Sequence, residues 1–192
     1  MAVEYRYSTF WPRFWAGFYD GLVFLPVSLA DNYLSSPARL PIVLIAWALF
    51  SYPAYWVYSV ALHAYRGQTV GKKATHVKVM DVSETRIPSL KQALLRDIGE
   101  IVPNSICLVY FIYLVVTHQY SAPFSQSSHW PILVLGFGSL GWFLLEVITM
   151  MTNSKRRALH DWIAGTVVVR VDPVLVDTPL IREILSQPPA EQ

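Results

Sequence analysis

The segment 41–61, PIVLIAWALFSYPAYWVYSVA, decides the fold class of this chain of 192 residues. It carries no charged side chain, and a helix of about 20 apolar residues is what a hydrocarbon core of about 30 Å requires. Similar apolar stretches lie at 14–30, 98–117 and 131–151. The stretch 14–30 is slightly short and contains Asp20, so it can cross a bilayer only with tilt or with a partner for the carboxylate. With 54% hydrophobic and 15% charged residues, the sequence predicts an integral membrane protein with four transmembrane helices.

Positive charges fall almost entirely on one side of these predicted helices. The chain has 15 Lys and Arg residues, and all except Arg39 lie near the N-terminus, in the loop 63–96 or after the last helix. Basic residues are enriched in cytoplasmic loops, so both termini and the central loop are expected inside the cell. We therefore expect a multi-pass protein of a bacterial-type inner membrane, in contact with the lipid bilayer. Its net charge of +2 reflects this topology, and we expect no nucleic acid partner.

The parts outside the membrane predict a small cytosolic β element. Residues 75–82 alternate polar and apolar side chains, the period of a half-buried strand. Residues 166–171 form a second β-branched run, and we expect it to pair with the first because an isolated strand leaves its backbone groups unpaired. Residues 87–88 could add a short edge strand.

Helical signals flank this β element. Ser89 to Gln92 has the form of a capping box, which predicts a helix that begins there and continues through Arg96 into the membrane. Residues 155–164 fit a short amphipathic helix at the membrane interface. The Pro-punctuated tail 172–192 is expected to be loosely ordered, which leaves 1–171 as the membrane domain.

Several acidic residues are expected at a similar depth near the cytoplasmic ends of the helices. Asp20 follows Arg13 by two helical turns, about 10 Å along the axis, and Glu146 and Glu100 lie near the ends of two other helices. One interpretation is a buried ion-pair network that fixes helix packing. A second is a cation or proton site at Asp20 that opens to the cytosol. A third is that these charges face a partner subunit.

Four motifs in this order resemble one known family. They are FWPR at 10–13 with AGFYD at 16–20, GQTVGK at 67–72, and RALHDWIAGT at 157–166. Together they resemble the RDD family of membrane proteins, which is named after one arginine and two aspartates. Arg13, Asp20 and Asp161 match those positions. The resemblance implies a membrane protein for which transport of ions or small solutes is proposed, and it supplies no agreed catalytic residues.

Asp161 is expected to pair within the cytosolic layer. Arg13 and Arg96 are predicted at the same interface, and we favour an Arg13–Asp161 bridge that holds the segment after the last helix under the first helix. His160 and Asp161 are poorly placed to bind one metal ion together, because adjacent side chains on a helix point about 100° apart. We predict no metal and no cofactor.

The sequence offers little support for an enzymatic function, and we expect that the protein is not an enzyme. No Ser-His-Asp or Cys-His arrangement has recognisable context. GQTVGK lacks half of the phosphate-binding loop pattern and follows a membrane helix, so its glycines more simply permit a tight turn. Lys72 and Lys73 of this segment could alternatively contact phosphate or lipid headgroups. The single cysteine, Cys107, rules out a disulfide within the chain.

The leading functional hypothesis is a transporter, or a transporter subunit, for a cation, a proton or a small solute. Asp20 would be the titratable site, with Glu146 and Glu100 around it and with Arg13, Arg96 and Asp161 as a gate or structural lock. Four helices are few for a self-sufficient transporter, so this hypothesis requires a homo-oligomer or a larger membrane complex. The alternative is a non-transporting accessory or scaffold subunit. A transport site needs Asp20 to reach water, whereas a scaffold would keep its buried charges paired and dry.

Overall fold

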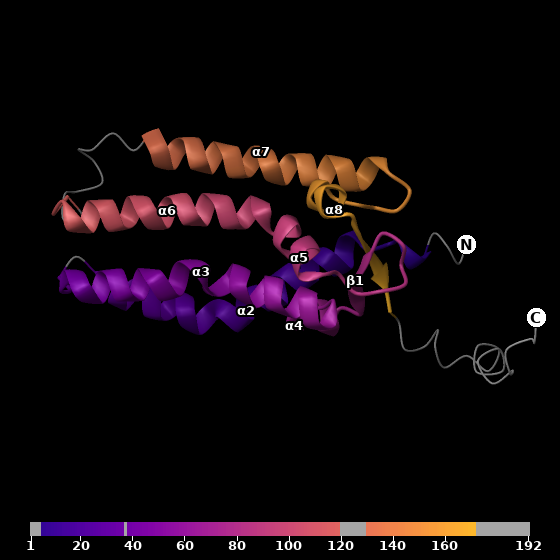
Figure 1. Ribbon diagram of the computed structural model, residues 1–192, viewed down its shortest axis with the longest axis horizontal. Helices are drawn as coiled ribbons and strands as arrows, with labels where there is room; N and C mark the ends of the chain where they lie inside the picture. The colour runs from indigo at the N-terminus through magenta and orange to yellow at the C-terminus, as the bar shows by residue number, and fades with distance from the viewer. Residues whose placement is uncertain (1–4, 37, 120–129, 172–192) are drawn as a thin grey trace, which may run out of the picture.

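Four long helices form most of the chain that the structure, a computed structural model, describes (residues 5–36, 38–119 and 130–171). They are α2 (Phe10–Leu34), α3 (Pro41–Arg66), α6 (Ile98–Val116) and α7 (Trp130–Thr152). Consecutive helices run in opposite directions and pack in the order α2, α3, α6, α7 (Figure 1). Each predicted apolar stretch therefore lies in a helix, apart from Thr117, which caps the end of α6.

The surfaces of these helices fit a membrane environment. Within the described residues, α3 and α6 are long and apolar enough to cross a bilayer, and the apolar part of α7, Gly136–Thr152, is shorter. Large apolar side chains such as Val109 and Phe137 are 68% and 72% exposed. A soluble protein rarely exposes apolar surface on this scale, whereas lipid covers it without cost.

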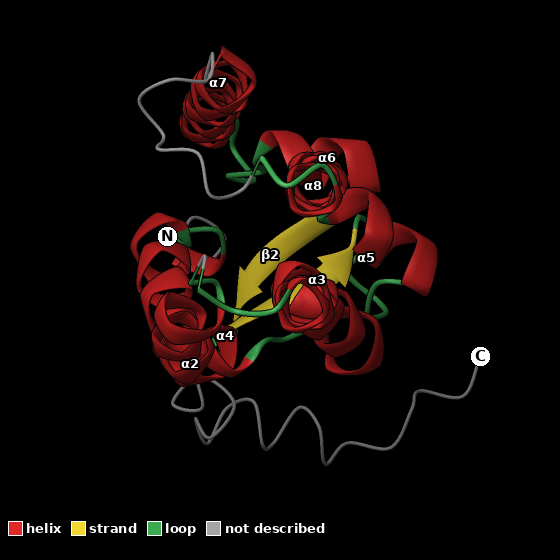
Figure 2. Ribbon diagram, turned by 90° about the vertical axis from the view of Figure 1, so that its left-hand side faces the viewer, coloured by secondary structure: helices red, strands yellow, loops and turns green. Residues whose placement is uncertain are grey.

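A two-stranded sheet closes one end of the bundle, which we call the sheet end (Figure 2). Strand β1 (Val77–Asp81) pairs antiparallel with β2 (Thr166–Arg170), with Val79 opposite Val168. The predicted pairing is confirmed, and β-branched side chains at its centre are fully buried. No edge strand forms at 87–88, because the chain closes as a turn in which Asp81 N donates to Arg86 O at 2.9 Å.

Three short helices connect the bundle to the sheet: α4 (Val70–Ala74), α5 (Leu90–Arg96) and α8 (Leu159–Ala164). The capping box at Ser89 is confirmed as the start of α5. The expected continuous helix from there into the membrane is wrong, because the chain turns at Asp97 between α5 and α6.

Helix α8 is also shorter than the predicted helix 155–164. The Asn153 side chain holds the preceding loop out of the helix, since it accepts a hydrogen bond from Arg157 N at 2.9 Å and donates to Arg157 O at 2.7 Å. The exposed side chains of Trp162 and Ile163 lie on one part of α8, as an amphipathic helix requires. The tail 172–192 lies outside the described residues.

The turn after α3 depends on Gly67. This residue has φ +69° and caps α3, and a Cβ atom there would lie 2.7 Å from Val79 O. Glycine adopts this left-handed conformation without a steric cost, and it also allows β1 to approach the helix end. The turn predicted at the GQTVGK segment is thus present, and its first glycine makes it.

We predict that Gly67→Ala lowers protein stability by about 1–3 kcal/mol, because strained backbone and a backbone clash combine at this position. The thermal unfolding midpoint in detergent, read by size-exclusion chromatography after heating, measures the effect. Gly17→Ala is the matched control: nothing lies within 4 Å of its Cβ position, and alanine is favoured over glycine inside a helix by about 0.5–1 kcal/mol. Equal midpoints for the two variants would contradict this account of the turn.

Candidate functional site

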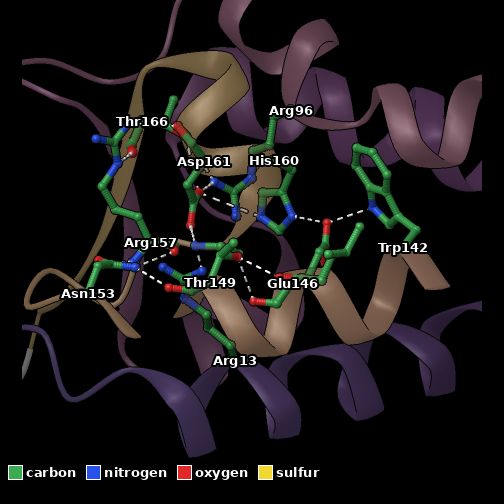
Figure 3. A network of polar contacts seen from close by, with 12 residues as sticks. Arg13, Arg96, Trp142, Glu146, Thr149, Asn153, Arg157, His160, Asp161 and Thr166 are labelled. Carbon is green, nitrogen blue, oxygen red and sulfur yellow. Dashed lines mark hydrogen bonds and ion pairs between the residues drawn. The ribbon is translucent and has the colours of Figure 1, made fainter. Parts of the chain in front are cut away.

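The buried carboxylate of Asp161 forms ion pairs with two arginines at the sheet end (Figure 3). Asp161 lies in the first turn of α8 and has no exposed surface. Arg13 of α2 donates from Nη1 to Asp161 Oδ2 at 2.6 Å, and Arg96 of α5 donates from Nη1 to Asp161 Oδ1. The ion pair expected between Arg13 and Asp161 is therefore present, and Arg96 completes what we call the Asp161 cluster.

Further donors complete the shell of this carboxylate. Ala158 N donates to Oδ2 at 3.0 Å, and Thr166 Oγ1 donates to Oδ1 at 3.2 Å. Burial alone raises the pKa of the Asp161 carboxyl, but the positive charges of Arg13 and Arg96 outweigh it and hold the pKa well below its ordinary value. The carboxylate is thus ionised, and it ties α2, α5 and α8 together.

Asp20, the other aspartate of the resemblance, has a different environment. Its side chain is 1% exposed, and among the described residues it accepts hydrogen bonds from neutral groups only. Tyr58 OH and Gly71 N donate to Oδ1, each at 2.8 Å, and Thr69 Oγ1 donates to Oδ2 at 2.6 Å. Asp20 therefore fixes the start of α4 against α2.

Close approach of the backbone makes this arrangement possible. A Cβ atom at Gly71 would lie 2.0 Å from Ala16 O, so only glycine brings the α4 backbone this near to α2. Two of these partners, Thr69 and Gly71, belong to the GQTVGK motif and could have been suspected from it. Tyr58 carried no signal, because nothing in its sequence context distinguishes it from the other aromatic residues of α3.

A polar cavity of about 550 Å³ lies beside the Asp161 cluster, between α3, α4, α5, α6, α7 and α8. We call it the sheet-end cavity. Carboxylates of Asp97, Glu100 and Glu146 line it, together with the imidazoles of His63 and His160. Charged groups of this kind are rare within a helix bundle of apolar exterior and commonly mark ion or substrate sites.

His160 connects the cavity with the Asp161 cluster (Figure 3). Its Nδ1 contacts Glu146 Oε1, which also accepts a hydrogen bond from Trp142 Nε1 at 2.8 Å. Its Nε2 lies 3.6 Å from Asp161 Oδ1. The two ring nitrogens thus face one carboxylate in the cavity and one in the cluster.

Other buried polar atoms of the cavity wall are available to a bound ion or solute. His63 is 1% exposed, its Nδ1 lies 3.2 Å from Ser59 Oγ and 3.9 Å from Asp97 Oδ2, and its Nε2 has no hydrogen-bond partner among the described residues. Lys72 lines the same wall, and burial lowers the pKa of its ammonium to about 8. An unpartnered buried polar atom is costly, which favours a polar occupant.

The residues singled out from the sequence divide into separate groups in space. Glu100 and Glu146 line the sheet-end cavity, whereas Asp20 is not among its lining residues. Arg96 reaches Asp161 rather than Glu100, its neighbour one turn along. Among the described residues, no group of three His, Cys, Asp or Glu side chains could hold a metal ion.

Comparison with models of known protein families assigns the chain to a family. A model of the RDD family matches residues 7–165. The chain belongs to the RDD family. Neither a curated protein nor a solved structure matches it. Membership in this family, together with the apolar helices α3 and α6, supports the conclusion that the chain is a membrane protein.

We predict that Asp161→Asn destabilises the protein by about 3–5 kcal/mol, because it leaves two buried guanidinium groups without their carboxylate. Arg13→Gln should cost less, since Asp161 then keeps Arg96. The depressed pKa of Asp161 contributes stability that is present above about pH 4, the ordinary pKa of aspartate, and is lost as the pH falls through the lower folded-state value. Thermal unfolding midpoints measured from pH 7 downward should therefore converge for the wild type and Asp161→Asn.

Arg156→Gln serves as the matched control, because its exposed guanidinium donates only to Met151 O, at 3.4 Å, among the described residues. It should change stability by no more than about 0.5 kcal/mol. A loss for Asp161→Asn as small as that of this control would show that the buried cluster does not hold the fold together.

Proposed function

We propose that this RDD-family protein moves a small cation or a proton across its membrane, and that Glu100 and Glu146 in the sheet-end cavity bind it. The observation that supports this proposal is the lining of the sheet-end cavity. It combines carboxylates from α6 and α7 with the buried and unpartnered His63 Nε2, in a volume of about 550 Å³. Protein cation sites and proton relays within membranes use acidic and histidine side chains of this kind.

The charge of the cavity wall favours a cation over an anion. Arg96 lines the cavity, but its guanidinium pairs with Asp161. Among the described residues of the wall, the three carboxylates of Asp97, Glu100 and Glu146 then outnumber the one remaining Lys or Arg side chain, that of Lys72. A cleft with an excess of one charge concentrates ions of the opposite sign.

The same proposal includes a topology. All four long helices cross the membrane, with both termini and the sheet end in the cytoplasm of a bacterial-type cell. The distribution of Lys and Arg supports this orientation. The protein acts as a homo-oligomer or in a larger membrane complex, because four helices enclose little space for a transport pathway.

We predict that the purified protein in liposomes conducts protons, Na⁺ or K⁺, and that Glu100→Gln and Glu146→Gln each reduce this flux by at least about tenfold. The reason is that removing an ionised group from the site removes about 1.4 kcal/mol or more of cation binding. Flux is followed with a pH-sensitive dye inside the vesicles and with imposed Na⁺ or K⁺ gradients.

Two variants make this experiment decisive. Glu84→Gln is the matched control, since Glu84 lies in the turn after β1, where it pairs with Arg6 and Lys155 away from the cavity. Flux per folded protein should match the wild type. Asp20→Asn tests which carboxylates bind the cation. If the folded Asp20→Asn protein loses its flux while Glu100→Gln keeps it, Asp20 is the binding residue and the proposal for the cavity is wrong.

A scaffold or accessory role is the second candidate, and one observation favours it. The intramembrane or interfacial aspartates Asp20 and Asp161 are both buried and fully supplied with protein donors, as a dry structural network requires. A folded wild-type protein without flux under any of these gradients would favour this role, and capture of partner proteins from the membrane would then be the next step.

A further inference from the structure

A second cavity, of about 750 Å³, lies between α2, α3 and α6. We call it the far-end cavity, because it extends away from the sheet along α2. Polar residues of its wall come from α3, from α6 and, above all, from the end of α2 and the residue after it, where the wall includes Ser28, Asp31, Asn32 and Ser35. A polar cavity at this depth between membrane helices calls for an explanation, because unpaired polar groups are disfavoured in a hydrocarbon environment.

The two cavities share part of their walls. Tyr55 of α3 and Glu100 and Asn104 of α6 line both of them. Asn104 Nδ2 donates to Glu100 O at 2.8 Å and lies 3.4 Å from Glu100 Oε2, so it fixes the position of this carboxylate. These three side chains therefore lie where the two cavities meet.

The lining residues also follow one face of each helix. On α3 the series Ala48, Tyr52, Tyr55, Ser59 and His63 advances by three or four residues, the spacing of a single helical face. Ser51, directly before Tyr52, also lines the cavity. On α6 the series Glu100, Asn104, Cys107 and Phe111 has the same spacing, and Gly99 and Pro103 lie directly before its first two members. The two cavities are therefore consecutive parts of one stripe.

The length of this stripe is close to that of a membrane crossing. From Ala48 to His63, α3 rises about 22 Å at 1.5 Å per residue, compared with a hydrocarbon core of about 30 Å. At the far end the charged lining residues are Asp31 and Glu100, and no Lys, Arg or His is among the described residues of that wall. Among its described residues, the far-end wall therefore carries acidic side chains without basic ones, which disfavours anions there.

We infer that the two cavities are the halves of one cation pathway, closed between them by Tyr55 and Asn104, with Glu100 as the group that a cation reaches from either side. This inference rests on the proposed transport function and deepens it: it names the route, the closure and a small monovalent cation or a proton as the occupant. Glu100 is the carboxylate common to both walls, which gives it access to both sides of the membrane in turn.

Sided cysteine labelling tests the pathway without measuring flux. In a Cys107→Ser background, which removes the native thiol from the sheet-end cavity, Ser51→Cys reports on the far-end cavity and Ser59→Cys on the sheet-end cavity. A membrane-impermeant cationic methanethiosulfonate is added to spheroplasts and to inverted membrane vesicles. The lipid-facing neighbours Phe50 and Val57, 55% and 48% exposed, supply the control variants Phe50→Cys and Val57→Cys.

We expect Ser51→Cys and Ser59→Cys to react from opposite faces of the membrane, each about tenfold faster than its control, because an acidic cleft concentrates a cationic reagent. With an anionic methanethiosulfonate, each cysteine should react no faster than its lipid-facing control. In Tyr55→Ala, both cysteines should react from both faces. Ser28→Cys, with Leu29→Cys as its control, provides a second far-end position if the Ser51 variant does not fold.

Two results would overturn the pathway. One is reaction of both cysteines from the same face with Tyr55 intact, and the other is a far-end cysteine that reacts no faster than its lipid-facing control. The test separates this inference from the proposed function. Correct sided labelling without flux would show a polar route in a protein that does not transport alone, whereas flux without labelling would place the route elsewhere.

Discussion

The burial of one carboxylate between two arginines positions the sheet end of this protein. Asp161 is fully buried, and its partners Arg13 and Arg96 come from elements far away in sequence. An isolated charge at such a place costs several kcal/mol, so the three elements fit together only when all three side chains meet. Because β2 follows α8 directly and α6 follows α5 after one turn, the same contact sets the start of a strand and of a membrane helix.

The cavity depends on this arrangement. The turn at Asp97 allows Arg96 to point toward Asp161, and it leaves Asp97 and Glu100 on the cavity wall. His160, next to Asp161 in α8, contacts Glu146 on the cavity wall through Nδ1, while its Nε2 lies 3.6 Å from Asp161 Oδ1. Adjacent residues on a helix point about 100° apart, so one turn of α8 supplies an anchor to the cluster and a polar group to the cavity.

Length and periodicity predicted most elements of the fold, but they could not predict how its acidic residues group. The four helices, the β1–β2 pairing and the capping box at Ser89 follow from local patterns. The expected grouping of Asp20 with Glu100 and Glu146 rested on their similar depth in the membrane. Depth does not specify which neighbour a helix face meets, and the neutral donors Tyr58 and Thr69 that surround Asp20 come from segments that only the folded chain brings near.

Arg13, Asp20 and Asp161, which match the arginine and the two aspartates of the family name in the sequence resemblance, therefore hold helices and the sheet end together. Other acidic residues line the sheet-end cavity. Each oxygen of Asp20 and Asp161 accepts hydrogen bonds from protein groups, so a cation would have to displace donors that the fold needs. Glu100 accepts a side-chain hydrogen bond only from Asn104 among the described residues. A carboxylate binds a mobile ion reversibly when its protein partners are few, because coordination then replaces water instead of breaking the structure.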